Sequence, residues 1–227
     1  MIDVLLLGAT GRTGTALLRH RPRNARLHLG VRIRGGTRPS SVPDGDDVRA
    51  IDLTDPVLMR AALSGIDVVV NAIRLPGEIP ATALIDLHER IATARDERRE
   101  EREGPLLIHV GGAGSLHLGD GRRFWRDPAF PAVTLPRGVA HAALRDHLES
   151  GGGSRDSSNW AYLIPPLGYV PEGRFTGAYR RLAPSDDERA LLRSTISYED
   201  FSLALADAIH EHWSGTHLIS AGCTSMP

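Results

Sequence analysis

The sequence contains no lysine: all 27 residues counted as Lys plus Arg are arginine. A P-loop NTPase uses a lysine to contact the nucleotide phosphates, and a Schiff-base enzyme uses one to form its imine. Both classes are therefore excluded, and no Tyr-x-x-x-Lys dyad can exist.

Cysteine and long apolar runs are also scarce. The single cysteine, Cys223, allows neither an intrachain disulfide nor a cysteine-ligated metal site. No run approaches the roughly 18 apolar residues of a membrane span, and no basic segment followed by an apolar one marks a secretory signal. A net charge of −1 argues against a nucleic-acid partner. We expect a cytoplasmic protein with no membrane or nucleic-acid partner, either a monomer or a homodimer.

The 227 residues, 41% of them hydrophobic, suit one globular domain with a substantial core. The short unbroken apolar run at 4–7 is typical of a strand buried on both faces, and the β-branched run within 66–72 and the mainly apolar segment 106–110 are also expected to be strands. Further strands are expected at 26–32, 48–51, 160–164 and 217–220. Helices are expected at 13–20, 54–63, 80–102, 139–149 and 198–213.

The alternation of strands and helices predicts an α/β fold: a Rossmann-type, doubly wound parallel sheet. We expect a single NAD(P)-binding domain over residues 1–227. The loops 113–137 and 166–196 would form a small substrate-side region, the second of them toward the C-terminus.

A glycine-rich segment, Gly-Ala-Thr-Gly-Arg-Thr-Gly at 8–14, joins the first strand to the first helix. Glycines at such a turn let the backbone approach a pyrophosphate, and the helix N-terminus offers free N–H groups to the anion. The alternative is a strand-to-helix turn with incidental glycines. The predicted cofactor contacts in this segment are Gly8, Thr10, Gly11, Arg12, Thr13 and Gly14.

The end of the second strand indicates which dinucleotide binds. NAD binding usually requires a carboxylate there for the ribose 2′-OH, but this chain has Arg32 and Arg34, with Arg12 projecting from the glycine loop. An arginine side chain can bind a phosphate through two parallel N–H···O hydrogen bonds. We therefore expect NADP(H) in preference to NAD(H), the alternative being that these arginines are only solvated.

Two further segments at strand ends are predicted to contact the cofactor. Asp52, followed by Leu53, could accept a hydrogen bond from the adenine amine. Asn71, Ala72 and Ile73 would run beside the adenosine ribose and the pyrophosphate.

The ordered series of motifs resembles the atypical short-chain dehydrogenase/reductase group, specifically its NmrA-like and flavin-reductase (biliverdin-IXβ-reductase-like) NAD(P)H-binding members. The resemblance covers nearly the whole chain. It is carried by 8–14, Val31-Arg32, Asp52-Leu53-Thr54-Asp55, Val68-Val69-Val70-Asn71-Ala72, 110–116, Pro165-Pro166 and 196–200. It implies further cofactor contacts at Gly111, Gly112 and Pro165.

The chain departs from the standard Ser, Tyr, Lys set of short-chain dehydrogenases. Arg137 falls at the Tyr position, His141 at the Lys position and Gly112 at the Ser position. All four tyrosines follow position 160, so the usual proton donor is missing.

Three side chains are the remaining candidates for catalysis. His141 titrates near neutral pH and is similar to a site histidine of the flavin-reductase branch. Arg74 resembles an arginine near the substrate of that branch, and Ser115 could hydrogen-bond a substrate oxygen. Each has a plainer interpretation: a half-exposed histidine, a solvated loop arginine and a turn serine. The histidines show no metal-ligand pattern, so no metal is expected.

The leading hypothesis is an NADPH-dependent reductase of a flavin, quinone or other carbonyl or enone acceptor, a small-molecule substrate. Hydride transfer to such acceptors needs mainly positioning beside the nicotinamide. Two alternatives remain open: an NmrA-like regulatory protein that senses NADP(H), and a non-redox isomerase or cyclase on the same fold.

Overall fold

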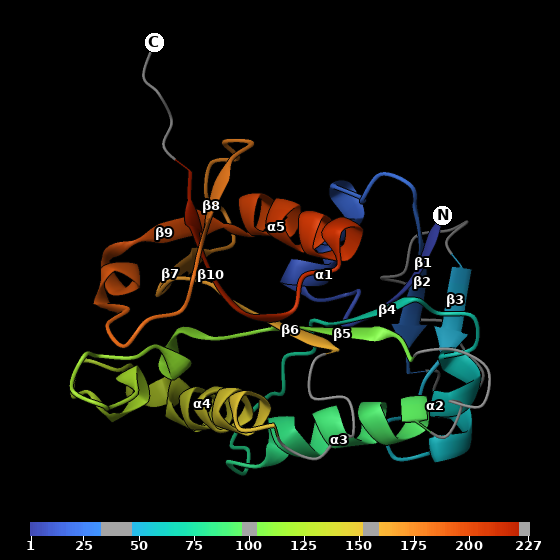
Figure 1. Cartoon of the computed structure of the whole chain (residues 1–227), viewed down its shortest axis with the longest axis horizontal. Coiled ribbons are helices and arrows are strands. Elements are labelled where there is room, and N and C mark those ends of the chain that lie inside the picture. Colours follow the sequence, from blue (N-terminus) through green and yellow to red (C-terminus); the bar gives the residue numbers. More distant parts are fainter. Residues whose placement is uncertain (33–46, 97–103, 152–158, 223–227) are drawn as a thin grey trace.

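The protein was analysed as a computed structural model that describes residues 1–32, 47–96, 104–151 and 159–222. One sheet of eight strands forms its centre (Figure 1), in the order β3-β2-β1-β4-β5-β6-β10-β8. The pairings are parallel except that of β10 with β8, which is antiparallel. The strands are β1 Ile2–Leu7, β2 Ala25–Val31, β3 Asp47–Ala50, β4 Val68–Asn71, β5 Leu106–Val110, β6 Trp160–Ile164, β8 Tyr179–Leu182 and β10 Gly215–Ala221. This architecture confirms the predicted Rossmann-type fold.

Helices cover both faces of the sheet. Helices α1 and α5 lie on one face, and α2, α3 and α4 lie on the other (Figure 1). Their bounds are α1 Arg12–Arg19, α2 Pro56–Ala62, α3 Ala83–Asp96, α4 Leu135–Glu149 and α5 Tyr198–Glu211. Asp55 caps α2 by accepting from the N–H groups of Val57 and Leu58, as the Thr-Asp-Pro sequence predicts.

Strand β1 shows why apolar runs without alternation form the centre of this sheet. Val4 and Leu6 are buried in the core beside α1 and α5, while Leu5 and Leu7 are buried in the core on the other face. Successive strand residues point to opposite faces, so a strand covered on both sides needs apolar residues at every position.

The region after β6 holds three short strands that the sequence did not predict. Strands β7 Gly168–Val170 and β9 Thr195–Ser197 pair in parallel as a separate two-stranded sheet, and β8 joins the edge of the main sheet. These segments are only three or four residues long and partly exposed, so they lack the hydrophobic pattern that identifies a strand. A 3-10 helix, η4 Arg189–Arg193, lies between β8 and β9.

The predicted loop at 113–137 is more ordered than its composition indicates. It contains three 3-10 turns, η1 Ala113–Ser115, η2 Phe124–Arg126 and η3 Ala132–Thr134. Helix α4 begins at Leu135, earlier than the predicted start at 139, with Pro136 in its first turn, where a missing N–H is tolerated.

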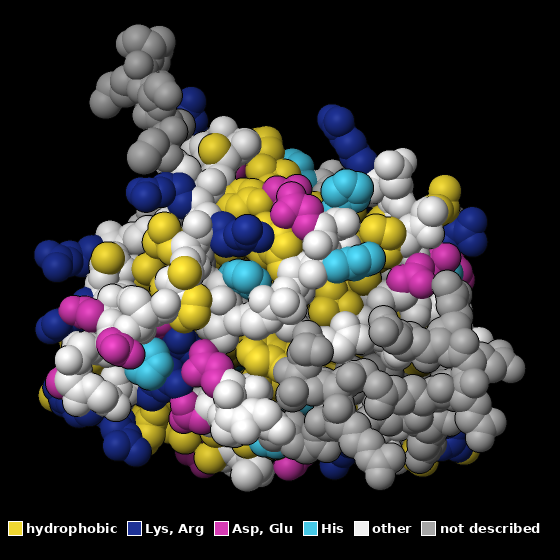
Figure 2. All heavy atoms as spheres, in the orientation of Figure 1, with side chains coloured by type: hydrophobic (Ala, Val, Ile, Leu, Met, Phe, Trp, Pro, Cys, Tyr) yellow, Lys and Arg dark blue, Asp and Glu magenta, His cyan; other side chains and the backbone are white. Residues whose placement is uncertain are grey.

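Acidic and arginine side chains are interspersed on the face drawn in Figure 2. None of the helices in the described ranges combines the length and the apolar character needed to cross a membrane.

Candidate active site

The carboxyl ends of the central strands meet at one edge of the sheet. Leu7 at the end of β1 pairs with Gly30 of β2 and Asn71 of β4, and Asn71 pairs with His109 of β5. The chain order reverses between β1 and β4, because β2 and β3 lie on one side of β1 and the later strands on the other. Ligands of open parallel sheets bind at such a switch point.

Two glycines of the glycine loop are required by its geometry. Gly8 has φ +81°, and a Cβ atom there would lie 2.6 Å from the Ala72 carbonyl oxygen. A Cβ on Gly14 would lie 2.3 Å from the Gly8 carbonyl oxygen. The loop therefore packs against the end of β4 and against its own helix through backbone atoms alone.

The N-terminus of α1 opens from this loop without a side-chain cap. Gly11 is the capping residue and has no side chain that could accept from the first N–H groups of the helix. These groups and the helix dipole favour an anion at this end. The geometry fits the phosphates of a dinucleotide, as the glycine spacing predicts.

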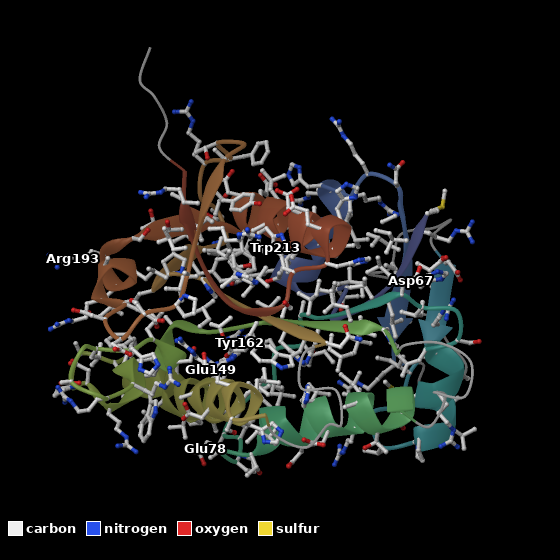
Figure 3. All side chains as sticks on the ribbon, in the orientation of Figure 1. Asp67, Glu78, Glu149, Tyr162, Arg193 and Trp213 are labelled. Carbon is white, nitrogen blue, oxygen red and sulfur yellow. The ribbon has the colours of Figure 1, made fainter. Side chains whose placement is uncertain are left out.

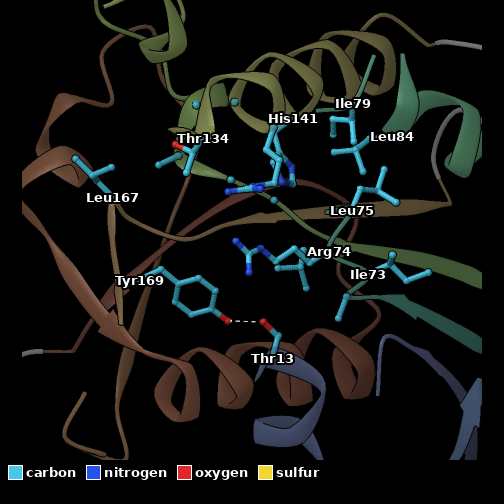
Figure 4. A pocket seen from close by; sticks show the side chains of 18 of the residues that line it. Thr13, Ile73, Arg74, Leu75, Ile79, Leu84, Thr134, His141, Leu167 and Tyr169 are labelled. Atoms are coloured by element: carbon cyan, nitrogen blue, oxygen red, sulfur yellow. Dashed lines mark hydrogen bonds between the residues drawn. The ribbon is translucent and has the colours of Figure 1, made fainter. Parts of the chain in front are cut away.

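A cavity of about 240 Å³ lies at this edge (Figure 4). Seven of the predicted site residues line it: Thr13, Ala72, Ile73, Arg74, Gly111, Gly112 and His141. Phe130, Thr134, Arg137, Leu167 and Tyr169 also line it, and they lie in the loops 113–137 and 166–196 that were expected on the substrate side. Leu75 and Tyr198 line it from outside the segments expected there. Residues far apart in the chain thus form one hollow between α1, β4, β5 and α4.

Two tyrosines line the cavity, Tyr169 from β7 and Tyr198, part of the motif at 196–200, from the start of α5. The Tyr169 hydroxyl is 2.9 Å from the Thr13 hydroxyl (Figure 4), and the rings of Tyr169 and Tyr198 stack at 3.8 Å. Burial raises the pKa of Tyr169 well above its usual value, so this phenol stays protonated. Although the Tyr-x-x-x-Lys dyad is missing, the cavity therefore still contains two phenol groups.

His141 faces the cavity from α4 (Figure 4). Its imidazole contacts Tyr162 of β6, which is labelled in Figure 3. The Tyr162 hydroxyl lies 3.1 Å from His141 Nδ1 and also donates to the His141 carbonyl oxygen at 3.1 Å. A phenol has one proton, so a hydroxyl that donates to the carbonyl must accept from Nδ1–H. His141 Nε2 then carries the lone pair and is a hydrogen-bond acceptor.

The charge state of His141 differs from the expectation. Desolvation, with the nearby positive charge of Arg137, lowers the pKa of His141 to about 4. The imidazole is neutral at pH 7, when only about one molecule in a thousand carries the proton. The expectation of a histidine titrating near neutral pH is wrong for this structure.

The other two catalytic candidates lie in different surroundings. Arg74 is exposed and extends toward the cavity between Tyr169 and His141 (Figure 4). Ser115 is fully buried behind the cavity wall, and its hydroxyl donates to the Gly112 carbonyl at 2.7 Å. In this structure Ser115 secures the turn after β5 and does not line the cavity.

The predicted cofactor residues at the strand ends fall into two groups. Thr10, Arg12 and Arg32 are exposed beside the glycine loop, and neither arginine forms an ion pair with any residue in the described ranges. Asp52 lies near Arg32, and its carboxylate accepts from the N–H and hydroxyl of Thr54, which lowers the pKa of Asp52. Arg34 lies outside the described ranges.

The second group supports the site from behind. Asn71 is buried, and its Oδ1 accepts from the Ile73 N–H at 3.2 Å, so its side chain fixes the backbone after β4. Leu53 packs against the core, and Pro165 is buried directly after β6. These three residues are not among the residues that line the cavity.

Asn71 also begins a chain of histidines that runs away from the cavity. Its Nδ2 donates to His109 Nδ1 at 3.2 Å, so the His109 proton is on Nε2 and is donated to His88 Nδ1 at 3.0 Å. The side chains of His88, Glu89 and His147 hold ligand-type atoms within 4.8 Å of one another. No local spacing in the sequence marks this cluster, because α3 and α4 bring it together. A histidine that accepts at Nδ1 carries its proton on Nε2, so we assign no metal to this cluster.

No protein-family model matches the chain. The uncharacterized protein YwnB of Bacillus subtilis is 27% identical over 209 residues, covering 91% of each protein. A crystal structure from Streptococcus pneumoniae TIGR4, of a protein provisionally named an NADH-flavin reductase, is 22% identical, with a TM-score of 0.71. That match covers 98% of this chain and 100% of the other.

A second solved structure, from Bacteroides thetaiotaomicron and provisionally named an epimerase, is 22% identical, with a TM-score of 0.73 and coverage of 99% of both chains. These likenesses confirm, at the level of the fold, the resemblance expected from the sequence. The names attached to the two structures differ in reaction, so the fold does not select one chemistry.

Proposed function

We propose that this chain, with the Rossmann fold of the atypical short-chain dehydrogenase/reductase group, is an NADPH-dependent reductase. Its acceptor would be a small flavin, quinone or other carbonyl or enone compound. The observation that carries the proposal is the uncapped N-terminus of α1, which opens beside the 240 Å³ cavity lined by Arg74 and His141. The names of the structural neighbours, an NADH-flavin reductase among them, support nicotinamide chemistry.

The residues present fit such a cofactor in three respects. Gly8 and Gly14 leave room that a Cβ would fill, and the first N–H groups of α1 have no side-chain acceptor. Arg12 and Arg32 are exposed guanidinium groups where a ribose 2′-phosphate would lie, which favours NADPH over NADH. The bound cofactor would supply a hydride.

The protein's own side chains would position the acceptor. Neutral His141 accepts a hydrogen bond at Nε2 from an N–H or O–H group of the acceptor, and the apolar wall excludes water from one side of it. Because His141 is unprotonated at neutral pH, we propose that the proton added to the acceptor comes from solvent.

Coenzyme binding and oxidation test the proposal together. We expect the purified protein to bind NADPH more tightly than NADH and to oxidise it in the presence of a panel of flavins and quinones. Replacing both Arg12 and Arg32 with Gln should weaken NADPH binding about tenfold or more and leave NADH binding nearly unchanged, because only NADPH has the 2′-phosphate. Equal affinity for the two coenzymes would contradict the NADPH preference.

The same experiment separates the alternatives. Tight NADPH binding without oxidation by any acceptor would favour an NADP(H)-sensing regulatory protein. Turnover that does not consume NADPH would favour a non-redox isomerase. Absence of dinucleotide binding would overturn both the reductase and the sensor.

A further inference from the structure

The charges that line the cavity are of one sign. Its walls carry two guanidinium groups, Arg74 and Arg137, and none of the lining residues is acidic. Within the described part of the chain, neither arginine is in an ion pair. Arg137 is only partly exposed and lines the cavity.

Buried arginines elsewhere in the chain have carboxylate partners. Arg145 forms a bidentate salt bridge with Glu188 at 2.7 and 2.8 Å, and Arg123 forms a salt bridge with Asp146. Arg137, which is half-buried, has no carboxylate partner among the described residues.

The position of Arg137 contributes nothing favourable to its helix. It lies in the first turn of α4, where the positive end of the helix dipole disfavours a cation. The hydroxyl of Thr134, the capping residue, donates to the Pro131 carbonyl at 3.0 Å, so this side chain does not cap the helix. The positive charge of the Arg137 guanidinium and the positive end of the α4 dipole therefore act at the same place, and together they favour a bound anion.

The rest of the cavity offers an apolar surface. Leu75, Phe130 and Leu167 line it, and Leu167 is 39% exposed at the rim. Val133, next to the lining residue Thr134, is 85% exposed. Large exposed apolar side chains beside a cavity indicate a ligand with an apolar body.

We infer that Arg137 selects an acceptor that combines a planar apolar body with an anionic group, a phosphate or a carboxylate. The anionic group binds the Arg137 guanidinium at the N-terminus of α4. The body lies against the apolar wall and His141, which is one helical turn beyond Arg137 on the same face. That this ligand is a hydride acceptor rests on the proposed reductase function, whereas the anion selectivity does not.

Flavin mononucleotide and riboflavin test this inference, because they share the same ring system and differ by one phosphate. Anthraquinone-2-carboxylate and its methyl ester form the corresponding pair for a carboxylate. Dissociation constants are measured by calorimetry, with and without saturating NADP⁺. In at least one pair we expect about tenfold tighter binding of the anion, and we expect Arg137→Gln to remove that preference.

Arg193→Gln is the matched control, since Arg193 is exposed and outside the cavity. It should leave both ratios unchanged. Equal binding within both pairs, or a preference that survives Arg137→Gln, would overturn the inference. So would a tenfold loss of NADPH affinity in Arg137→Gln with no change in acceptor binding, because Arg137 would then bind the cofactor.

Failure of the two proposals can be told apart. NADPH binding, followed by nicotinamide fluorescence, tests the reductase independently of the acceptor ratios. A second readout checks that Arg137→Gln removes only a charge: the pKa of His141, followed by NMR, should rise because the nearby positive charge is gone. An unchanged pKa of His141 in a folded variant would contradict the placement of Arg137 beside it.

Discussion

Single residues at the glycine loop determine whether the site can form. Gly8 combines a left-handed backbone conformation with backbone contacts that leave no space for a Cβ atom. Gly65 has the same kind of conformation, φ +68°, but a Cβ atom added there would have no neighbouring atom within 4 Å. The two glycines therefore allow conformational strain and steric crowding to be measured separately.

We expect Gly65→Ala to lower the free energy of unfolding by about 1 kcal/mol, the strain of a left-handed alanine. Gly8→Ala should lower it by at least about 2 kcal/mol more, because the Ala72 carbonyl must also move. Gly8→Ala should weaken NADPH binding as well. Chemical denaturation of both variants measures the difference, and equal losses would show that the close approach to Ala72 carries no energy.

At the scale of elements, a buried ion pair connects the C-terminal region to helix α4. Arg145 and Glu188 have side chains only 1% and 0% exposed, and Arg145 also donates to the Ser115 carbonyl at 2.9 Å. Glu188 accepts from the His117 N–H at 2.9 Å. The pair thus holds the segment before η4 and the turn after β5 on the same helix that carries His141.

We expect Glu188→Gln to destabilise the protein by about 3 kcal/mol, because it leaves the buried Arg145 charge with less compensation. Asp187→Asn is the comparison variant. Asp187 pairs with Arg189 at 2.7 Å, but both side chains are about half exposed and screened by solvent, so its loss should cost much less than that of Glu188. Similar losses in the two variants, measured by urea unfolding, would refute the role given to the buried pair.

At the scale of the whole molecule, neutral histidines that are buried or half-buried link stability to pH. Desolvation lowers the pKa values of His109, His117, His141 and His217 below 6.5. These groups bind protons more readily in the unfolded chain than in the folded one. Their stabilisation is present in full above pH 6.5 and is lost as the pH falls toward the folded-state values.

We therefore expect the free energy of unfolding to fall between pH 6.5 and pH 4, before most carboxylates titrate. His141, with a pKa of about 4, would account for a loss of up to about 3 kcal/mol over this range. His141→Phe should make the decline shallower in equilibrium unfolding measured across this range. If the free energy of unfolding of His141→Phe falls as steeply with pH as that of the wild type, then His141 is not held as a neutral group in the folded protein.

The order of elements could be predicted from the sequence because local rules govern it. Continuous apolar runs mark strands covered on both faces, and the glycine loop lies where the first strand turns into the first helix. The strands β7, β8 and β9 could not be predicted from the sequence. They are stabilised by pairing with segments distant in the chain, and their own composition does not identify them as strands. The placement of Ser115 behind the cavity wall likewise depends on tertiary packing.

Residue identity and spacing were enough to establish the Rossmann-type sheet, the glycine loop and the lack of a catalytic lysine. The contents of the cavity came from the folding of distant segments against one another. Folding placed Tyr169 and Tyr198 in the same cavity as His141 and made that histidine neutral through desolvation. Contact between distant segments and exclusion of water are properties of the folded chain, and no local pattern encodes them.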